Sequence, residues 1–107
     1  MKMLAVSSAQ RAAIAPDVPT VSEAAGIKDF DFSLWGGFFA PRGTPPEIVT
    51  QLNAAINEVL ALPDIKTKMA EAGAEIIPMS VDQFGAFIKR ESGKYQHIVE
   101  QTGIKPE

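Results

Sequence analysis

Residues 31–53, DFSLWGGFFAPRGTPPEIVTQLN, contain the sharpest change of pattern in the chain. Apolar and polar residues alternate up to residue 34, and residues 35–39 are then continuously apolar. This change is typical of a strand that is half exposed at its start and covered on both faces further along. The APRGTPP segment then breaks the pattern, and apolar residues return at helical spacing. The stretch therefore predicts a buried strand, a rigid turn and a helix.

The helix after this turn has strong start signals in the sequence. Thr44 is the expected N-cap, Pro45 fits the first helical position, and Glu47 completes a capping box. Six apolar residues then fall on one helical face, which predicts packing against a sheet or a neighbouring helix: Ile48, Leu52, Ala55, Ile56, Val59 and Leu60.

Three further helices and two further strands are predicted from the same kinds of signal. Capping boxes at Thr20 and Ser80 predict helices over residues 21–25 and from residue 81 to about 102, and Gly26 and Gly103 are the expected ends of these helices. Pro63 opens another short helix, which Gly73 ends. Short apolar runs at residues 3–6 and 74–77 are the two additional strands.

Composition restricts the possible functions. The chain has 107 residues, a formal net charge of -3 and no cysteine. Without a basic surface, nucleic acid is disfavoured as a partner, and disulfides and thiolate chemistry are excluded. No apolar run reaches the roughly 20 residues of a membrane span, and the N-terminal MKMLAVSSAQRAA has too short an apolar stretch for a signal peptide.

Few residues suggest chemistry. His97 is the only histidine, and the sequence places no nucleophile or orienting group for it, so a structural role is favoured over catalysis. Asp29 and Asp31 are better interpreted as solvated turn charges than as metal ligands. Trp35 fits a core position better than a platform for a ligand. No catalytic residue, metal site or cofactor is predicted, and enzyme activity is the least favoured class.

The order of several segments resembles a known family. LAVSSAQR, PDVPTVSEAAGI, LWGGFFAPRGTPPEIVTQLNAAINEVL, AEAGAEI and VEQTGIKPE follow one another as in the C-terminal part of the substrate-binding proteins of tripartite tricarboxylate transporters, the Bug family of periplasmic receptors. The resemblance covers nearly the whole chain. It implies an α/β fold of the type II, Venus-flytrap kind, in which two lobes close on a small carboxylated solute that a membrane permease then takes up.

The resemblance also implies a domain organisation. Residues 1–30 correspond to the end of the second lobe, residues 31–41 to the strand that returns to the first lobe, and residues 42–107 to the C-terminal helices of that lobe. In this chain they would form part of a lobe, with helices packed on a small mixed sheet. The expected cleft-lining residues are Ser7, Ser8, Arg11 and Trp35, and Gly36 and Gly37 are the expected hinge.

Two classes of function remain open from the sequence. In the first, the chain is part of a periplasmic receptor for a carboxylated solute and binds that solute weakly or not at all by itself. In the second, it is a stand-alone α/β module that self-associates without capturing a ligand. In either case the isolated chain is expected to form a homo-oligomer, for example a domain-swapped dimer that exchanges the segment around Gly36.

Overall fold

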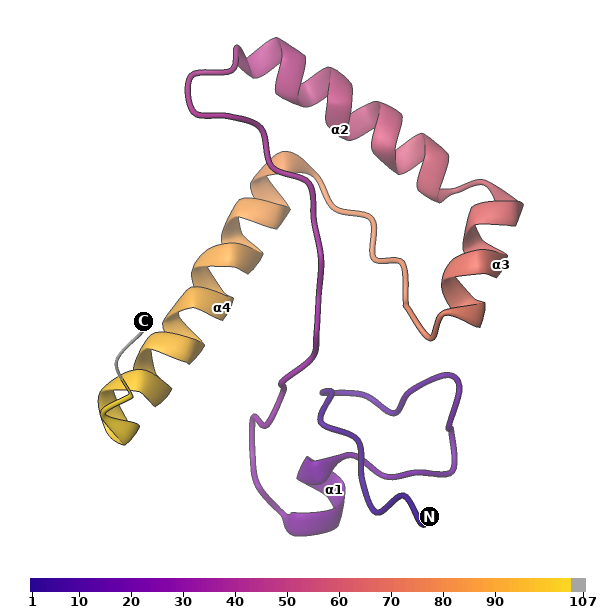
Figure 1. The fold of residues 1–107 in the computed structure, drawn as a ribbon, viewed down its shortest axis with the longest axis vertical. Coiled ribbons are helices and arrows are strands. Elements are labelled where there is room, and N and C mark those ends of the chain that lie inside the picture. Colours follow the sequence, from indigo (N-terminus) through magenta and orange to yellow (C-terminus); the bar gives the residue numbers. More distant parts are fainter. Residues whose placement is uncertain (105–107) are drawn as a thin grey trace. The chain divides into compact units, whose positions relative to one another are not determined.

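The computed structural model describes residues 1–104 and contains four helices within them (Figure 1). They are α1 (Val21–Ala25), α2 (Pro46–Leu60), α3 (Pro63–Glu71) and α4 (Val81–Thr102). The chain divides into two compact units, Met1–Phe39 and Ala40–Glu107. The first unit contains α1, and the second contains the other three helices.

The first unit is organised around Val6 and Thr20. The Val6 N–H donates to the Pro19 carbonyl at 2.9 Å, and the Val21 N–H donates to the Val6 carbonyl at 2.9 Å, which gives a parallel bridge between Val6 and Thr20. Thr20 then caps α1 as predicted, since its Oγ1 accepts the Glu23 N–H. Gly26 ends this helix in the left-handed conformation at φ 66°, as its place after a short amphipathic segment predicts.

The expected mixed sheet does not form within residues 1–104. The Val6–Thr20 bridge is the one isolated bridge, and the segments predicted as strands at residues 3–6, 30–39 and 74–77 have no ladder there. A strand is stable only when a neighbouring strand satisfies its backbone groups, and sequence patterns give the tendency without the neighbour. The predicted strands are therefore segments without sheet partners in the described chain.

The predicted N-cap of α2 is wrong. The helix begins at Pro46 with Pro45 at the N-cap position and no side-chain cap. Thr44 instead closes a turn with Pro41, whose carbonyl accepts both the Thr44 N–H at 3.2 Å and the Thr44 hydroxyl at 2.7 Å. Gly43 has a φ of 88°, which suits a type II turn. The Thr44 hydroxyl therefore belongs to the turn before α2, as a donor, and α2 begins one residue too late for Thr44 to be its N-cap.

The remaining helix boundaries follow the sequence signals. Pro63 lies at the start of α3, and Gly73 follows its end with a φ of 73°. Ser80 and Gln83 form the predicted capping box of α4, and Gly103 ends that helix at φ 67°. These signals act within a few residues, so the local sequence is enough to position them.

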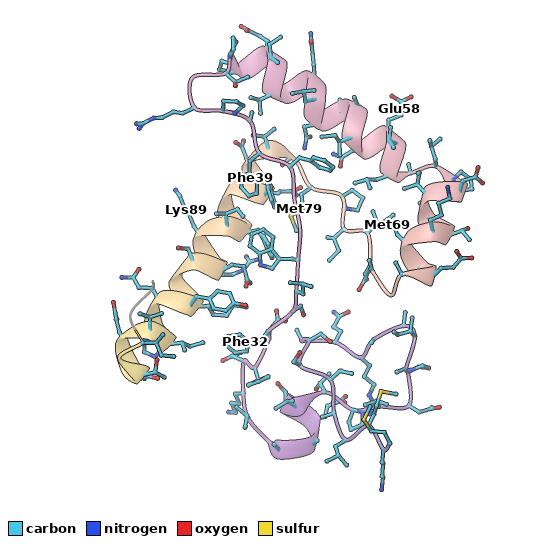
Figure 2. The ribbon with its side chains drawn as sticks, in the orientation of Figure 1. Phe32, Phe39, Glu58, Met69, Met79 and Lys89 are labelled. Carbon is cyan, nitrogen blue, oxygen red and sulfur yellow. The ribbon has the colours of Figure 1, made fainter. Side chains whose placement is uncertain are left out.

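Helix α2 packs against both α3 and α4. Asn53 and Asn57 also fix the connection that leads into α4, because both side-chain amides donate to the Met79 carbonyl, at 2.9 and 3.0 Å. Figure 2 labels Met79 in this connection. The two asparagines therefore join residues more than 20 positions apart.

The described chain has almost no buried interior. No hydrophobic residue is buried among residues 1–104, and the buried residues are Thr20 and Glu91. Glu91 pairs with Lys94 one turn further along α4, at 2.8 Å from Oε1 to Nζ. A domain of this size ordinarily buries a large part of its apolar surface, and here much of that surface is open.

Candidate functional site

The candidate site begins at the loop that follows Val6. Ser7 is exposed and Ser8 is half-buried. The Ser7 carbonyl accepts the Phe32 N–H at 2.8 Å, and the Ser8 hydroxyl donates to the Gln10 carbonyl at 2.7 Å. The loop is thus attached to the start of the segment that leads to Trp35.

Asp31 has a structural contact that the sequence did not indicate. Its Oδ1 accepts the Ala9 N–H at 3.1 Å, across 22 positions, so the interpretation of Asp31 as a solvated turn charge is wrong. Asp29 does lie in a turn, with a φ of 57° that Asp tolerates better than most residues. Asp31 was missed because its partner is a backbone N–H, which leaves no pattern in the sequence.

Arg11 is bound to the start of α1. Its Nε donates to Glu23 Oε2 at 2.9 Å, and its Nη1 donates to the Pro16 carbonyl at 3.2 Å. The same Glu23 oxygen accepts the Thr20 N–H at 2.9 Å. The Thr20 N–H and the Arg11 guanidinium together lower the pKa of Glu23 below its usual value. Arg11 therefore already has an anionic partner, with which a solute carboxylate would compete.

Trp35, Gly36 and Gly37 lie near the end of the first unit. Trp35 is 38% exposed, so it is not the buried core residue that its apolar surroundings predicted. Neither glycine has a positive φ, and a Cβ added at Gly36 would meet no atom within 4 Å. The backbone conformation there does not require glycine, and the hinge remains a prediction.

The candidate residues share the first unit but have different local anchors. Ser7 is attached to Phe32, whereas Arg11 is attached to α1 through Glu23. What they can offer a ligand is a guanidinium, an indole, hydroxyls and backbone N–H groups. These are groups that bind and orient an anion, and they include no nucleophile paired with a base.

No cluster of three or more His, Cys, Asp or Glu side chains is placed to hold a metal ion within residues 1–104. None of the helices in that part of the chain combines the length and apolarity required to span a membrane. His97, the single histidine, lies on α4.

Comparison with protein families identifies the class. Residues 1–104 match the model of the tripartite tricarboxylate transporter family receptor, TctC. The chain belongs to this family of solute receptors. The family resemblance drawn from the order of the sequence segments is thereby confirmed.

Individual relatives agree with the family match. The chain is 35% identical over 105 residues to Protein BugT of Bordetella pertussis, which covers 98% of this chain and 32% of that protein. It is 34% identical over 99 residues to the UPF0065 protein in the tcbD-tcbE intergenic region of Pseudomonas sp. strain P51, covering 92% of this chain and 30% of that protein. The chain thus spans about a third of the length of these relatives.

A solved structure shows the same fold. The periplasmic binding protein BugD is similar with a TM-score of 0.76 and 30% identity over 96% of this chain and 35% of its own. The matched family and the solved relative are receptors and binding proteins, not enzymes. The α/β class of the prediction agrees with this relative, although the mixed sheet is not formed within the described residues.

Proposed function

We propose that this chain is part of a periplasmic receptor that captures a small carboxylated metabolite for a transporter of the tripartite tricarboxylate type. The observation that carries the proposal is the family match over residues 1–104. The likeness to a periplasmic binding protein over 96% of the chain supports it. In this role the receptor would release its solute to a membrane permease.

Within the complete receptor, Ser7, Ser8, Arg11 and Trp35 would line the solute cleft. Arg11 supports this assignment because its side chain is 46% exposed and lies in a loop, where its charge can reach an incoming carboxylate. Exchange of Glu23 for a solute carboxylate would preserve the charge pairing of the guanidinium. Gly36 and Gly37 would supply the hinge about which the cleft closes.

The chain by itself should bind carboxylates weakly. An exposed Arg–carboxylate pair contributes on the order of 0 to 1 kcal/mol, whereas even millimolar affinity requires about 4 kcal/mol. Arg11 must in addition give up Glu23. Receptors of this kind gain affinity by enclosing the solute between groups from two lobes.

Calorimetry tests this proposal. Dicarboxylates and tricarboxylates are titrated into the isolated chain and into a chimera in which this chain replaces the matching part of Protein BugT. We expect the chimera to show saturable carboxylate binding and the isolated chain to show none. Arg11→Gln should weaken that binding at least tenfold, whereas Lys28→Gln, which removes another exposed cation of the first unit, should leave it unchanged.

Two results would contradict the proposal. A folded chimera that binds no carboxylate would refute the proposed solute class. Saturable micromolar binding by the isolated chain, lost in Arg11→Ala or Trp35→Ala, would show that this chain or its oligomer builds a whole cleft.

A second function, a self-associating module without a ligand, is favoured by the exposed apolar residues. Leu34, Phe38 and Phe39 are among the large hydrophobic side chains that are more than two-thirds exposed. Surfaces of this kind promote association. Discrete homodimers that persist in the presence of the remaining receptor polypeptide would support this function over solute capture.

A further inference from the structure

Two neighbouring hydrogen bonds join the loop of residues 7–11 to the later part of the first unit. The Phe32 N–H donates to the Ser7 carbonyl at 2.8 Å. The Ala9 N–H donates to Asp31 Oδ1 at 3.1 Å, across 22 positions. Figure 2 labels Phe32 in this part of the chain. All four residues belong to the first unit, so the two contacts are internal to one compact body.

The Val6–Thr20 bridge shows the register that a parallel pair adopts in this unit. Val6 donates its N–H to the Pro19 carbonyl, and its own carbonyl accepts the Val21 N–H, two positions further along. Both bonds of a regular parallel bridge therefore join backbone groups, and their partners on the facing segment are two residues apart.

At Phe32 the same register begins and is then interrupted. Phe32 donates its N–H to the Ser7 carbonyl, so a regular parallel bridge would direct the Ala9 N–H to the Phe32 carbonyl. The Asp31 carboxylate accepts that N–H instead. No bridge between these two segments is found within residues 1–104. A side chain thus replaces the backbone acceptor at the point where the loop begins.

The replaced acceptor lies beside the candidate cleft-lining residues. The chain bends over residues 7–10 and does not continue as a strand. Ser8 lies between the two bonded positions of the loop, and its hydroxyl donates to the Gln10 carbonyl at 2.7 Å. Arg11 follows directly and is held on α1. The bend therefore has one anchor at Asp31 and a second at the start of α1.

We propose that Asp31 is a positioning residue of the solute cleft, whose carboxylate fixes the bend at residues 7–10 and thereby the way in which Ser7 and Ser8 face the solute. The inference rests on the proposed function, in which this loop lines the cleft. Asp31 is half-buried and acts through the Ala9 N–H. A hydrogen bond to an ionised acceptor is about twice as strong as one between neutral groups. Binding groups that are held in place before the ligand arrives lose less freedom on binding.

Three variants distinguish the hydrogen bond from the charge. Asp31→Ala removes the acceptor, whereas Asp31→Asn keeps a side-chain oxygen for the Ala9 N–H. Asp29→Asn removes an equal charge nearby, in a turn with a φ of 57° that Asn also tolerates. Hydrogen exchange of the full chain, followed by NMR, measures the protection of the Ala9 amide and requires no solute. The Val21 amide of the neighbouring bridge is the internal reference.

We expect Asp31→Ala to lower the protection of the Ala9 amide at least tenfold and Asp31→Asn to lower it less than threefold. Asp29→Asn should leave it unchanged, and the Val21 amide should keep its protection in all three variants. Unchanged protection of Ala9 in Asp31→Ala would overturn the proposal. So would an equal loss at Val21, which would indicate general loosening of the unit, or an equal loss in Asp31→Asn, which would assign the effect to the charge.

Calorimetry on the chimera with Protein BugT adds the functional measurement. With a carboxylate that the unmodified chimera binds, Asp31→Ala should weaken binding at least tenfold and Asp31→Asn less than threefold. Equal binding by both variants and the unmodified chimera would overturn the positioning role. A chimera that binds no carboxylate would refute only the proposed solute class, and the protection of the Ala9 amide would still decide whether Asp31 holds the loop.

Discussion

The two units of the chain hold their conformation by different means. The first unit, Met1–Phe39, has a single helix of five residues and depends on hydrogen bonds between distant segments, such as Phe32 to Ser7 and Asp31 to Ala9. The second unit, Ala40–Glu107, consists mainly of three longer helices whose ends are fixed locally. The contrast shows that a helix can form with few tertiary contacts, because its backbone hydrogen bonds lie within one segment. A strand needs a neighbouring strand, because its backbone hydrogen bonds join two segments.

Each unit nevertheless exposes apolar side chains, and the largest expected effect concerns them. We expect the isolated chain to self-associate at micromolar concentration, because no hydrophobic residue is buried within residues 1–104. Multi-angle light scattering measures this directly. A compact monomer across the micromolar range would contradict the expectation.

The same experiment can distinguish the two units. Leu52→Glu in the second unit and Phe38→Glu in the first each remove exposed apolar surface. If one substitution alone restores a monomer, the association belongs to that unit. Exchange through the segment around Gly36, as in a swapped dimer, predicts instead that a rigidifying Gly36→Pro alters the oligomer.

The next effect concerns the long-range contact of the second unit. Asn53 and Asn57 donate to the same Met79 carbonyl, so each alone can satisfy it. Replacing one with Ala should cost about 0.5 kcal/mol, and replacing both about 2 kcal/mol, because only the double change leaves the carbonyl unsatisfied. Urea denaturation followed at 222 nm gives these free energies of unfolding. Simple additivity of the two single effects would show that the shared carbonyl does not couple them.

A smaller effect distinguishes Ser80, the observed N-cap of α4, from Thr44, which the sequence predicted as the N-cap of α2. Ser80→Ala removes an observed N-cap and should lower the free energy of unfolding by about 1 kcal/mol. Thr44→Ala removes only the hydroxyl contact with the Pro41 carbonyl and should cost about 0.5 kcal/mol or less. Chemical denaturation of both variants under identical conditions provides the comparison. Equal losses would restore Thr44 as a helix cap.

The smallest effect is the pH dependence of the first unit. The pKa of Glu23 is lower in the folded chain than in the unfolded one, first through the Thr20 N–H and then through Arg11. Its contribution to stability is therefore complete above the unfolded value, about 4.3, and is lost as the pH falls through the folded value. The protection of the Thr20 and Glu23 amides against hydrogen exchange, relative to the intrinsic exchange rate at each pH, should fall in that acid range.

Glu23→Gln provides the control for this pH dependence. It keeps an acceptor for the Thr20 N–H and removes the charge, so the protection of the Thr20 amide should no longer depend on pH in this range. The second unit, followed at the amides of α4, should change little over the same range. An unchanged acid response in Glu23→Gln would assign the effect to another carboxylate.

The helices could be predicted well from the sequence, whereas the candidate site stays a prediction. The caps at Thr20 and Ser80 and the left-handed glycines at 26, 73 and 103 were all predicted, since each depends on residues within one or two turns. The order of the segments was sufficient to recognise the receptor family. The cleft-lining role of Ser7, Ser8, Arg11 and Trp35 stays a prediction, because a cleft depends on groups that come together only in three dimensions.

The sequence by itself therefore determined the set of helices, most of their ends and the family, because helix caps and the order of segments depend on residues that are close together along the chain. Only the tertiary structure decided that Thr44 serves a turn, that Asp31 binds the Ala9 N–H and that Glu23 binds Arg11. It also decided that Ile56 and Leu60 of α2 are half-buried whereas Ile48 and Leu52 of the same helix are exposed. These outcomes depend on backbone groups and surfaces from distant residues, whose positions no local pattern specifies.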